Sequence, residues 1–196
     1  MQTITRAYDT YKKARGAVNE LESAGIPMSE ISVLANHRVG EQWGDFDGLE
    51  QGTEAGSGAA VGAAVGGAAG LLAGLGIMAI PGLGPVVAAG WLASTALGVA
   101  AGSATGGIVG SLIESGVPED HAHVYSEAVR RGGTLISVKT EDHDVAKVQA
   151  ILGNYIPLDP VEQSAAYRET GWDKFDPAAA PYESTRAAAE RDTRLM

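Results

Sequence analysis

Residues 55–113 read AGSGAAVGAAVGGAAGLLAGLGIMAIPGLGPVVAAGWLASTALGVAAGSATGGIVGSLI, and this stretch decides the fold. It contains 16 of the chain's 27 glycines and not one Asp, Glu, Lys, Arg or His. All 14 basic and 24 acidic residues of the 196-residue chain therefore lie outside it. The sequence thus describes a polar module that is interrupted by an apolar insert, which we call the charge-free segment.

Small residues recur at every fourth position in two ladders within the charge-free segment. Residues four apart lie on one face of a helix, so each ladder predicts a helix with a stripe that carries almost no side chains. Each glycine costs a helix roughly 1 kcal/mol relative to alanine, and close packing against a second helix can offset that cost. The helix-packing positions are Gly58, Gly62, Gly66, Gly70 and Gly74 in the first ladder, and Gly90, Ser94, Gly98, Gly102, Gly106 and Gly110 in the second.

A turn motif separates the two ladders. Its residues Pro81, Gly82, Gly84 and Pro85 would end one helix and allow the next to begin. Helices over 55–79 and 86–113 would be about 37 and 42 Å long at ~1.5 Å per residue. Because both exceed the ~30 Å hydrocarbon core of a bilayer, the segment is predicted to be an antiparallel helical hairpin able to span a membrane.

Such a hairpin has three places to bury its apolar surface. It can insert into a membrane, with Trp91 as an interfacial anchor, or pack against hairpins of other copies in a soluble homo-oligomer, or fold onto its own domain. The acidic flanks Glu50, Glu54 and Glu114 do not follow the positive-inside rule. We take the membrane hairpin as the first hypothesis and the soluble self-assembly as its alternative.

The polar module, residues 1–54 and 114–163, alternates strand and helix signals. Strands are expected over 2–7, 30–35, 134–140 and 155–161, the last restricted to a sheet edge by its prolines. Helices are expected after Asp9, after Pro118 and after the acidic run 142–144. This βαβ…αβαβ order predicts an α+β fold of ferredoxin-like type with the hairpin inserted in its middle.

Residues 164–196 form a third kind of region, rich in alanine and mixed in charge. They have too little apolar surface for a core of their own, which indicates an extended or disordered tail. A second interpretation is a docking segment whose aromatic residues enter a groove of the same or a neighbouring subunit. Those residues are Trp172, Phe175 and Tyr182.

Charge and composition exclude several classes of function. The net charge of −10 has no basic segment to oppose it, so neither nucleic acid nor an anionic membrane surface is an expected partner. The absence of cysteine excludes disulfides and thiolate chemistry. The N-terminal residues contain no apolar core of signal-peptide length, which favours a cytoplasmic location for the polar module.

Candidates for chemistry are weak. His121 and His123 are two apart and would point to different sides of a helix, so they do not share a metal ion. The run 141–144 is explained by helix capping, and His37 and Arg38 have no visible partner. No glycine-rich phosphate loop or nucleophile motif is present. We therefore expect no catalytic residue, no cofactor, no metal and no small-molecule substrate.

Three blocks of the sequence carry a resemblance to a known family. They are Glu20-Leu21 with 24–27 and 31–34, the turn 79–85, and 115–119 followed by 125–135. In order and spacing, these blocks make residues 1–156 similar to the general stress protein 17M-like family. The resemblance implies a bacterial, stress-associated domain interrupted by a glycine-rich hairpin, and it implies no catalytic residues.

The sequence thus predicts a non-enzymatic stress-response protein. Its glycine-zipper hairpin would insert into a membrane as two transmembrane helices and self-associate there, with the polar module facing the cytoplasm. In the alternative, hairpins of several copies bury one another in a large soluble homo-oligomer.

Overall fold

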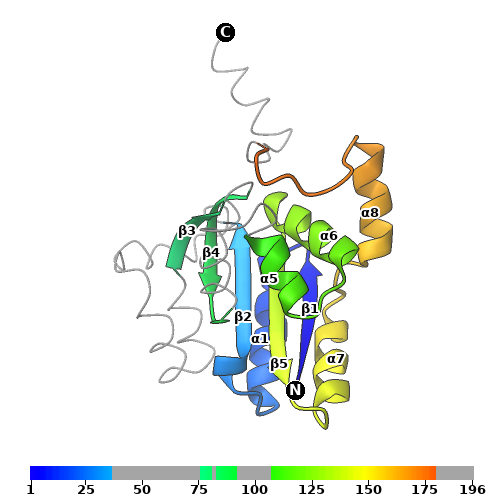
Figure 1. Cartoon of the computed structure of the whole chain (residues 1–196). Helices are drawn as coiled ribbons and strands as arrows, with labels where there is room; N and C mark the ends of the chain where they lie inside the picture. The colour runs from blue at the N-terminus through cyan, green and yellow to red at the C-terminus, as the bar shows by residue number, and fades with distance from the viewer. Residues whose placement is uncertain (37–75, 81–82, 92–106, 180–196) are drawn as a thin grey trace.

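The computed structural model describes residues 1–36, 76–80, 83–91 and 107–179. They form a mixed α+β fold around one five-stranded antiparallel sheet of order β1-β5-β2-β4-β3 (Figure 1). The strands are β1 Gln2–Tyr8, β2 Ile31–Asn36, β3 Gly76–Ile80, β4 Gly84–Ala89 and β5 Thr134–Thr140. The helices are α1 Tyr11–Ser23, α5 Ile108–Glu114, α6 Glu119–Arg130, α7 Val145–Asn154 and α8 Pro160–Glu169, with a 3₁₀ turn η1 at Met28–Glu30.

The centre of the sheet joins the two halves of the polar module. β5 pairs antiparallel with both β1 and β2, so these two strands run parallel to each other with β5 between them. Val138 pairs with Ile4 on one side and with Ile31 on the other. The unit β1-α1-β2 is therefore a split β-α-β arrangement, completed by a strand that lies about 100 residues further along the chain.

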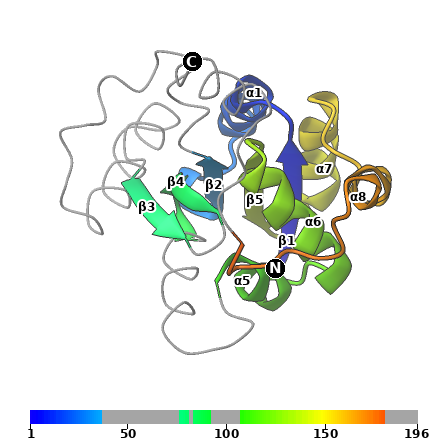
Figure 2. The same ribbon diagram turned by 90° about the horizontal axis from the view of Figure 1, so that it is seen from above.

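Helices cover both faces of the sheet (Figure 2). α1 and α7 pack on one face and, with the strands beneath them, form cluster A; α5 and α6 cover the opposite face over cluster B. Cluster A contains Ile4, Tyr8, Ala14, Ala17, Val18, Leu21, Ile26, Met28, Ile31, Val33, Ala89, Ile136, Val138, Val148, Ile151 and Leu152. Cluster B contains Ala7, Leu34, Leu83, Val86, Ala88, Ile108, Val109, Leu112, Val117, Ala122, Tyr125, Ala128, Val129, Leu135 and Phe175.

The first helix shows how local signals set the elements of the polar module. Its N-cap is Thr10, whose side chain accepts from the Lys13 N–H, so the predicted cap at Asp9 is wrong by one residue. Asp9 instead pairs with the Lys13 ammonium at 2.9 Å. The helix ends as predicted at Gly25, whose φ of +84° suits glycine, and the Ile26 N–H returns to the Leu21 carbonyl.

The predicted helical hairpin is wrong over 76–80 and 84–89, whereas 108–113 are helical in α5, as the sequence predicts. Residues 76–80 and 84–89 are strands, and the chain reverses between Ile80 and Gly84 to pair them. Each aliphatic run is only five or six residues long and is bounded by glycine and proline, which is the length of a strand. β2 also offers an edge, along which β4 pairs from Val33↔Ala89 to Asn36↔Val86.

The ferredoxin-like arrangement is not confirmed. Such α+β folds keep their helices on one side of the sheet, whereas here α1 and α6 lie on opposite faces (Figure 2). The strand expected over 155–161 is also wrong. In the described residues, one backbone hydrogen bond joins this stretch to β1: the Leu158 N–H donates to the Ala7 carbonyl at 2.7 Å.

Helix α8 replaces the end of that expected strand. Asp159 accepts from the N–H groups of Val161 and Glu162 at 2.8 and 3.1 Å and so caps the helix. Pro160 follows at the first helical position, where a missing N–H does no harm. The tail predicted to be extended from residue 164 is therefore helical up to Glu169.

Candidate functional site

The structure describes only some of the sequence-predicted site residues. Gly58, Gly62, Gly66, Gly70, Gly74, Ser94, Gly98, Gly102, Gly106, Pro81, Gly82 and Tyr182 lie outside the described residues, as do His37 and Arg38. Gly84 and Pro85 belong to strand β4, although the sequence predicted a turn between helices there. Gly110 lies within α5, and Gly90 follows β4 directly.

Gly90 has a role that differs from the predicted helix packing. Its φ of +88° is not helical, and a Cβ added to it would lie 2.5 Å from the Ile31 carbonyl oxygen and 2.8 Å from the Ser32 Cα. Beside it, the Ser32 hydroxyl donates to the Ala89 carbonyl at 2.9 Å. Gly90 therefore permits the close backbone approach by which the end of β4 meets the start of β2.

The two edges of the sheet differ in chemistry. The outer edge of β3 has no strand partner within the described residues, and its sequence Gly-Ile-Met-Ala-Ile carries neither a charge nor a proline. At the other edge, β1 includes Arg6, and its Ala7 carbonyl accepts from the Leu158 N–H. Proteins usually protect sheet edges with lysine, proline or covering segments, so β3 is the edge suited to pairing with another chain.

The start of the tail packs against its own chain. Phe175 is 4% exposed within cluster B. Trp172 meets Tyr167 of α8 in an edge-to-face contact with ring centres 5.5 Å apart, and the Arg131 guanidinium lies 4.1 Å from the centre of the Tyr167 ring. Of the predicted docking residues that the structure describes, Phe175 is buried in the core of its own chain.

A buried carboxylate that the sequence reasoning missed stands at the end of α6. Glu127 is fully buried, and one of its oxygens accepts from Arg130 Nη2 at 2.7 Å and from Arg131 Nε at 2.6 Å. Arg131 also donates to the Thr170 hydroxyl at 3.2 Å, which links α6 to the end of α8. The spacing Glu-x-x-Arg-Arg places all three on one helix face and was the available signal, although the burial was not visible from it.

The histidines and acidic clusters do not converge. His123 Nε2 lies 3.9 Å from Glu119 of the same helix, and His143 is within 3.4 Å of its neighbours Glu141 and Asp144. A hydrogen bond from Lys147 lowers the pKa of Asp144. Across the described ranges, no group of three His, Cys, Asp or Glu side chains is placed to hold a metal ion.

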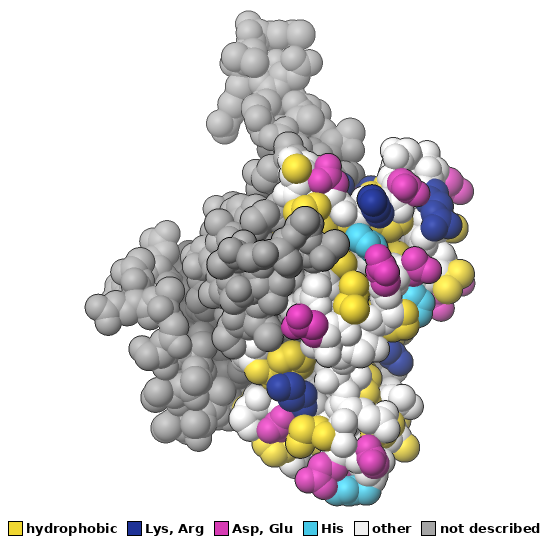
Figure 3. Space-filling model, viewed as in Figure 1, with side chains coloured by type: hydrophobic (Ala, Val, Ile, Leu, Met, Phe, Trp, Pro, Cys, Tyr) yellow, Lys and Arg dark blue, Asp and Glu magenta, His cyan; other side chains and the backbone are white. Residues whose placement is uncertain are grey.

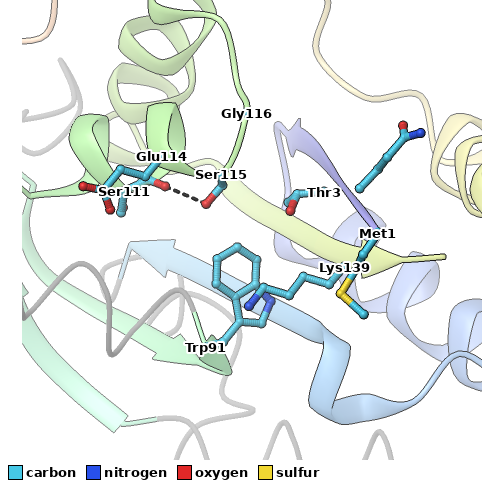
Figure 4. A pocket seen from close by; sticks show the side chains of 9 residues that line it. Met1, Thr3, Trp91, Ser111, Glu114, Ser115, Gly116 and Lys139 are labelled. Atoms are coloured by element: carbon cyan, nitrogen blue, oxygen red, sulfur yellow. Dashed lines mark hydrogen bonds between the residues drawn. The ribbon is translucent and has the colours of Figure 1, made fainter. Parts of the chain in front are cut away.

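A hollow of about 620 Å³ opens between the start of β1, the end of α5 and the middle of the sheet (Figure 4). We call it the α5 hollow. Lys139 of β5 places its ammonium 4.1 Å from the centre of the Trp91 ring, and the indole N–H donates to the Glu30 carbonyl at 3.4 Å. The lining residues are Met1, Gln2, Thr3, Trp91, Ser111, Glu114, Ser115, Gly116 and Lys139.

The outer surface shows no large basic field in the part of this face that the structure describes. Acidic side chains are spread over it, with single Lys and Arg groups between them (Figure 3). This distribution agrees with the net charge of −10. It offers no stripe of positive charge along which a phosphate backbone would be held.

Comparisons with known proteins identify no relative. No family model matches the chain, and neither a curated protein nor a solved structure matches it. Among the helices that the structure describes, none has the length and apolar character needed to cross a bilayer.

Proposed function

We propose that this chain is a non-catalytic protein that self-associates through its charge-free segment, with the β3 edge as the contact between copies. The observation that carries the proposal is the placement of β3 at the end of the sheet, where its outer backbone groups have no strand partner in the described residues. A second copy can supply that partner by antiparallel edge-to-edge pairing, which extends the sheet across a two-fold axis.

The distribution of charge supports this choice. A net charge of −10 makes copies repel one another, but every charged residue lies outside residues 55–113. The β3 edge is therefore the part of the sheet where backbones can approach with the least repulsion. Because salt screens charges beyond about 8 to 10 Å near physiological ionic strength, self-association should strengthen as salt is added.

The proposal also includes the family resemblance and the ferredoxin-like part of the fold. The resemblance in residues 1–156 to the general stress protein 17M-like family supports a stress-associated bacterial role. The split β-α-β unit of β1, α1 and β2 around β5 is the part that a ferredoxin-like relative would share. On this view the charge-free segment is an assembly element that the family adds to a small α+β core.

Added charge on β3 tests the proposal. Ile77→Lys and Met78→Lys each place a lysine on the edge strand and should convert the wild-type oligomer to monomer in light scattering coupled to size exclusion. Gln2→Lys is the matched control, because it adds the same charge at an exposed position of the opposite edge strand and should leave the oligomer mass unchanged. Circular dichroism checks that all three variants fold.

Three outcomes would count against the proposal. A wild-type chain that stays monomeric at high concentration and high salt has no self-association to explain. A wild-type oligomer whose mass is unchanged in both β3 variants would move the contact elsewhere. If the wild-type chain instead floats with neutral phosphatidylcholine vesicles and requires detergent for extraction, the membrane-inserted hypothesis for the charge-free segment replaces the edge contact.

A further inference from the structure

Met1 lines the α5 hollow, and its N-terminal ammonium pairs with Asp142 at 3.6 Å. The hollow also contains two opposite side-chain charges that come from different elements. Lys139 lies on β5, and Glu114 is the last residue of α5. In the described part of the chain, Lys139 contacts only the Trp91 ring by an electrostatic interaction, and Glu114 has no ion pair. The hollow therefore presents one cationic and one anionic group that are not neutralised within the protein.

The Lys139 ammonium is positioned by the Trp91 ring, and this contact leaves N–H donors available for a ligand. Its contact with the Trp91 ring uses the face of the indole, and the indole is itself fixed by its hydrogen bond to the Glu30 carbonyl. A lysine ammonium has three N–H donors, and a ring contact leaves donors for an anionic group. Figure 4 shows the Lys139 side chain running beside the ring into the hollow.

A negative side chain lines the hollow at the end of α5. Glu114 is exposed at the C-terminal end of α5, where the carbonyl ends of the helix add to the negative potential. Ser115 beside it donates its hydroxyl to the Ser111 carbonyl at 2.6 Å, which fixes the chain at this point (Figure 4). A group with positive charge is therefore favoured on this side, and a group with negative charge on the Lys139 side.

We propose that the α5 hollow binds a small zwitterionic ligand of amino-acid size, with its carboxylate at Lys139 and its ammonium at Glu114. The volume of about 620 Å³ falls in the range of roughly 300 to 1,000 Å³ typical of small-molecule sites. A purely anionic ligand would be repelled by the Glu114 carboxylate and by the net charge of −10 of the chain. A purely cationic ligand would meet Lys139, so only a ligand with both charges is favoured by both walls.

Calorimetric titration of the full chain with three amino acids, L-phenylalanine, L-leucine and L-glutamine, tests the proposal. At least one should bind saturably with one site per chain. For L-phenylalanine, the analogues 3-phenylpropionate, which lacks the ammonium, and phenethylamine, which lacks the carboxylate, should each bind at least ten-fold more weakly. Absence of saturable binding by all three amino acids, or equal affinity for both analogues and the amino acid, would overturn it.

Variants distinguish recognition of both charges from a general loss of structure. Lys139→Met should weaken amino-acid binding at least ten-fold and at the same time strengthen binding of phenethylamine, because the repelling ammonium is gone. Glu114→Gln should also weaken amino-acid binding, and it should strengthen binding of 3-phenylpropionate, because the repelling carboxylate is gone. Lys147→Met on α7, outside the hollow, is the control and should bind as wild type. Unchanged amino-acid affinity in both hollow variants would refute the assignment.

Discussion

The two faces of the sheet are built from different parts of the chain. Cluster A draws almost entirely on the polar module, to which the charge-free segment adds Ala89 in the described residues. Cluster B, in contrast, contains Leu83, Val86, Ala88, Ile108, Val109 and Leu112 from the charge-free segment, together with Phe175 from the tail. Most of the core residues that the charge-free segment contributes in the described ranges thus belong to cluster B.

This difference between the two clusters changes how the absence of charged residues from the charge-free segment is interpreted. A long stretch without charge in a polar chain suggests a separate element that buries its apolar surface in lipid or against another copy of the chain. Here β4 and α5 instead cover residues of β2, β5 and α6 that would otherwise face water. The sheet face over cluster A is covered by α1 and α7 of the polar module. The face over cluster B is covered in part by residues of the charge-free segment and of the tail.

The largest expected effect compares two glycines with the same backbone conformation. Gly25 and Gly90 have φ of +84° and +88°, but a Cβ at Gly25 meets nothing within 4 Å. Gly25→Ala should therefore cost only the left-handed conformation, about 1 to 2 kcal/mol. Gly90→Ala adds a collision with the backbone of β2, worth about 1 to 3 kcal/mol more, measured as the free energy of unfolding in urea.

Equal losses in those two alanine variants would show that β4 can shift away from β2 without loss, and the described contact between the charge-free segment and the polar module would then be weak. A larger loss at Gly25 would reverse the comparison between the two regions. Hydrogen exchange of the β2 amides identifies which strand pairing is lost in each variant.

The next effect compares one anchor from each face. Phe175→Ala should lower the free energy of unfolding by about 3 kcal/mol, because a buried aromatic side chain is removed from cluster B. Leu21→Ala in cluster A is the matched core truncation and should cost about as much. Only the Phe175 variant should become more sensitive to trypsin at Lys174, since the tail has lost its anchor. A loss below about 1 kcal/mol for Phe175→Ala would mean that the tail is dispensable for face B.

The smallest effect concerns one buried tyrosine on each face. Burial raises the pKa of Tyr8 in cluster A and of Tyr125 in cluster B, and Arg6 partly offsets both shifts. Because the unfolded chain ionises first, near pH 10, stability is full below that pH and falls as the pH rises above it. Tyr8→Phe and Tyr125→Phe should each flatten this alkaline decline in urea unfolding.

Tyr8→Phe should also cost about 1 kcal/mol at neutral pH, because the hydroxyl donates to the Leu152 carbonyl at 2.9 Å. If neither tyrosine variant changes the alkaline slope, other groups control the loss of stability at high pH. Tyrosinate absorbance during an alkaline titration reports the two ionisations directly.

Local signals were sufficient for most strands and helices of the polar module. The β-branched run 134–140, the apolar spacing before Gly25 and the acidic start after Pro118 each predicted the right kind of element in the right place. They succeed because strand alternation, helix periodicity and capping are properties of neighbouring residues. The helix α8 was missed because Asp159 and Pro160 were interpreted as the end of a strand and not as a cap with a first-turn proline.

Non-local contacts decided the rest. A four-residue glycine spacing keeps small residues on one face of a helix, but it also keeps them on one face of a strand, whose period is two. For residues 76–80 and 84–89 the choice was made by the free edge of β2, which lies 40 or more residues earlier. The stacking of Lys139 on Trp91 and the burial of Glu127 likewise depend on neighbours that no local pattern reveals.

The position of β5 between β1 and β2 has a consequence for how the protein is made. β1 and β2 have no common partner until residues 134–140 have been synthesised, because β5 lies between them. The whole charge-free segment is produced before that strand. Pairings between such distant residues form slowly, and uncharged strands that wait for a partner are prone to join other chains. We therefore expect the speed of translation between residues 55 and 140 to influence how much of the protein reaches its folded state.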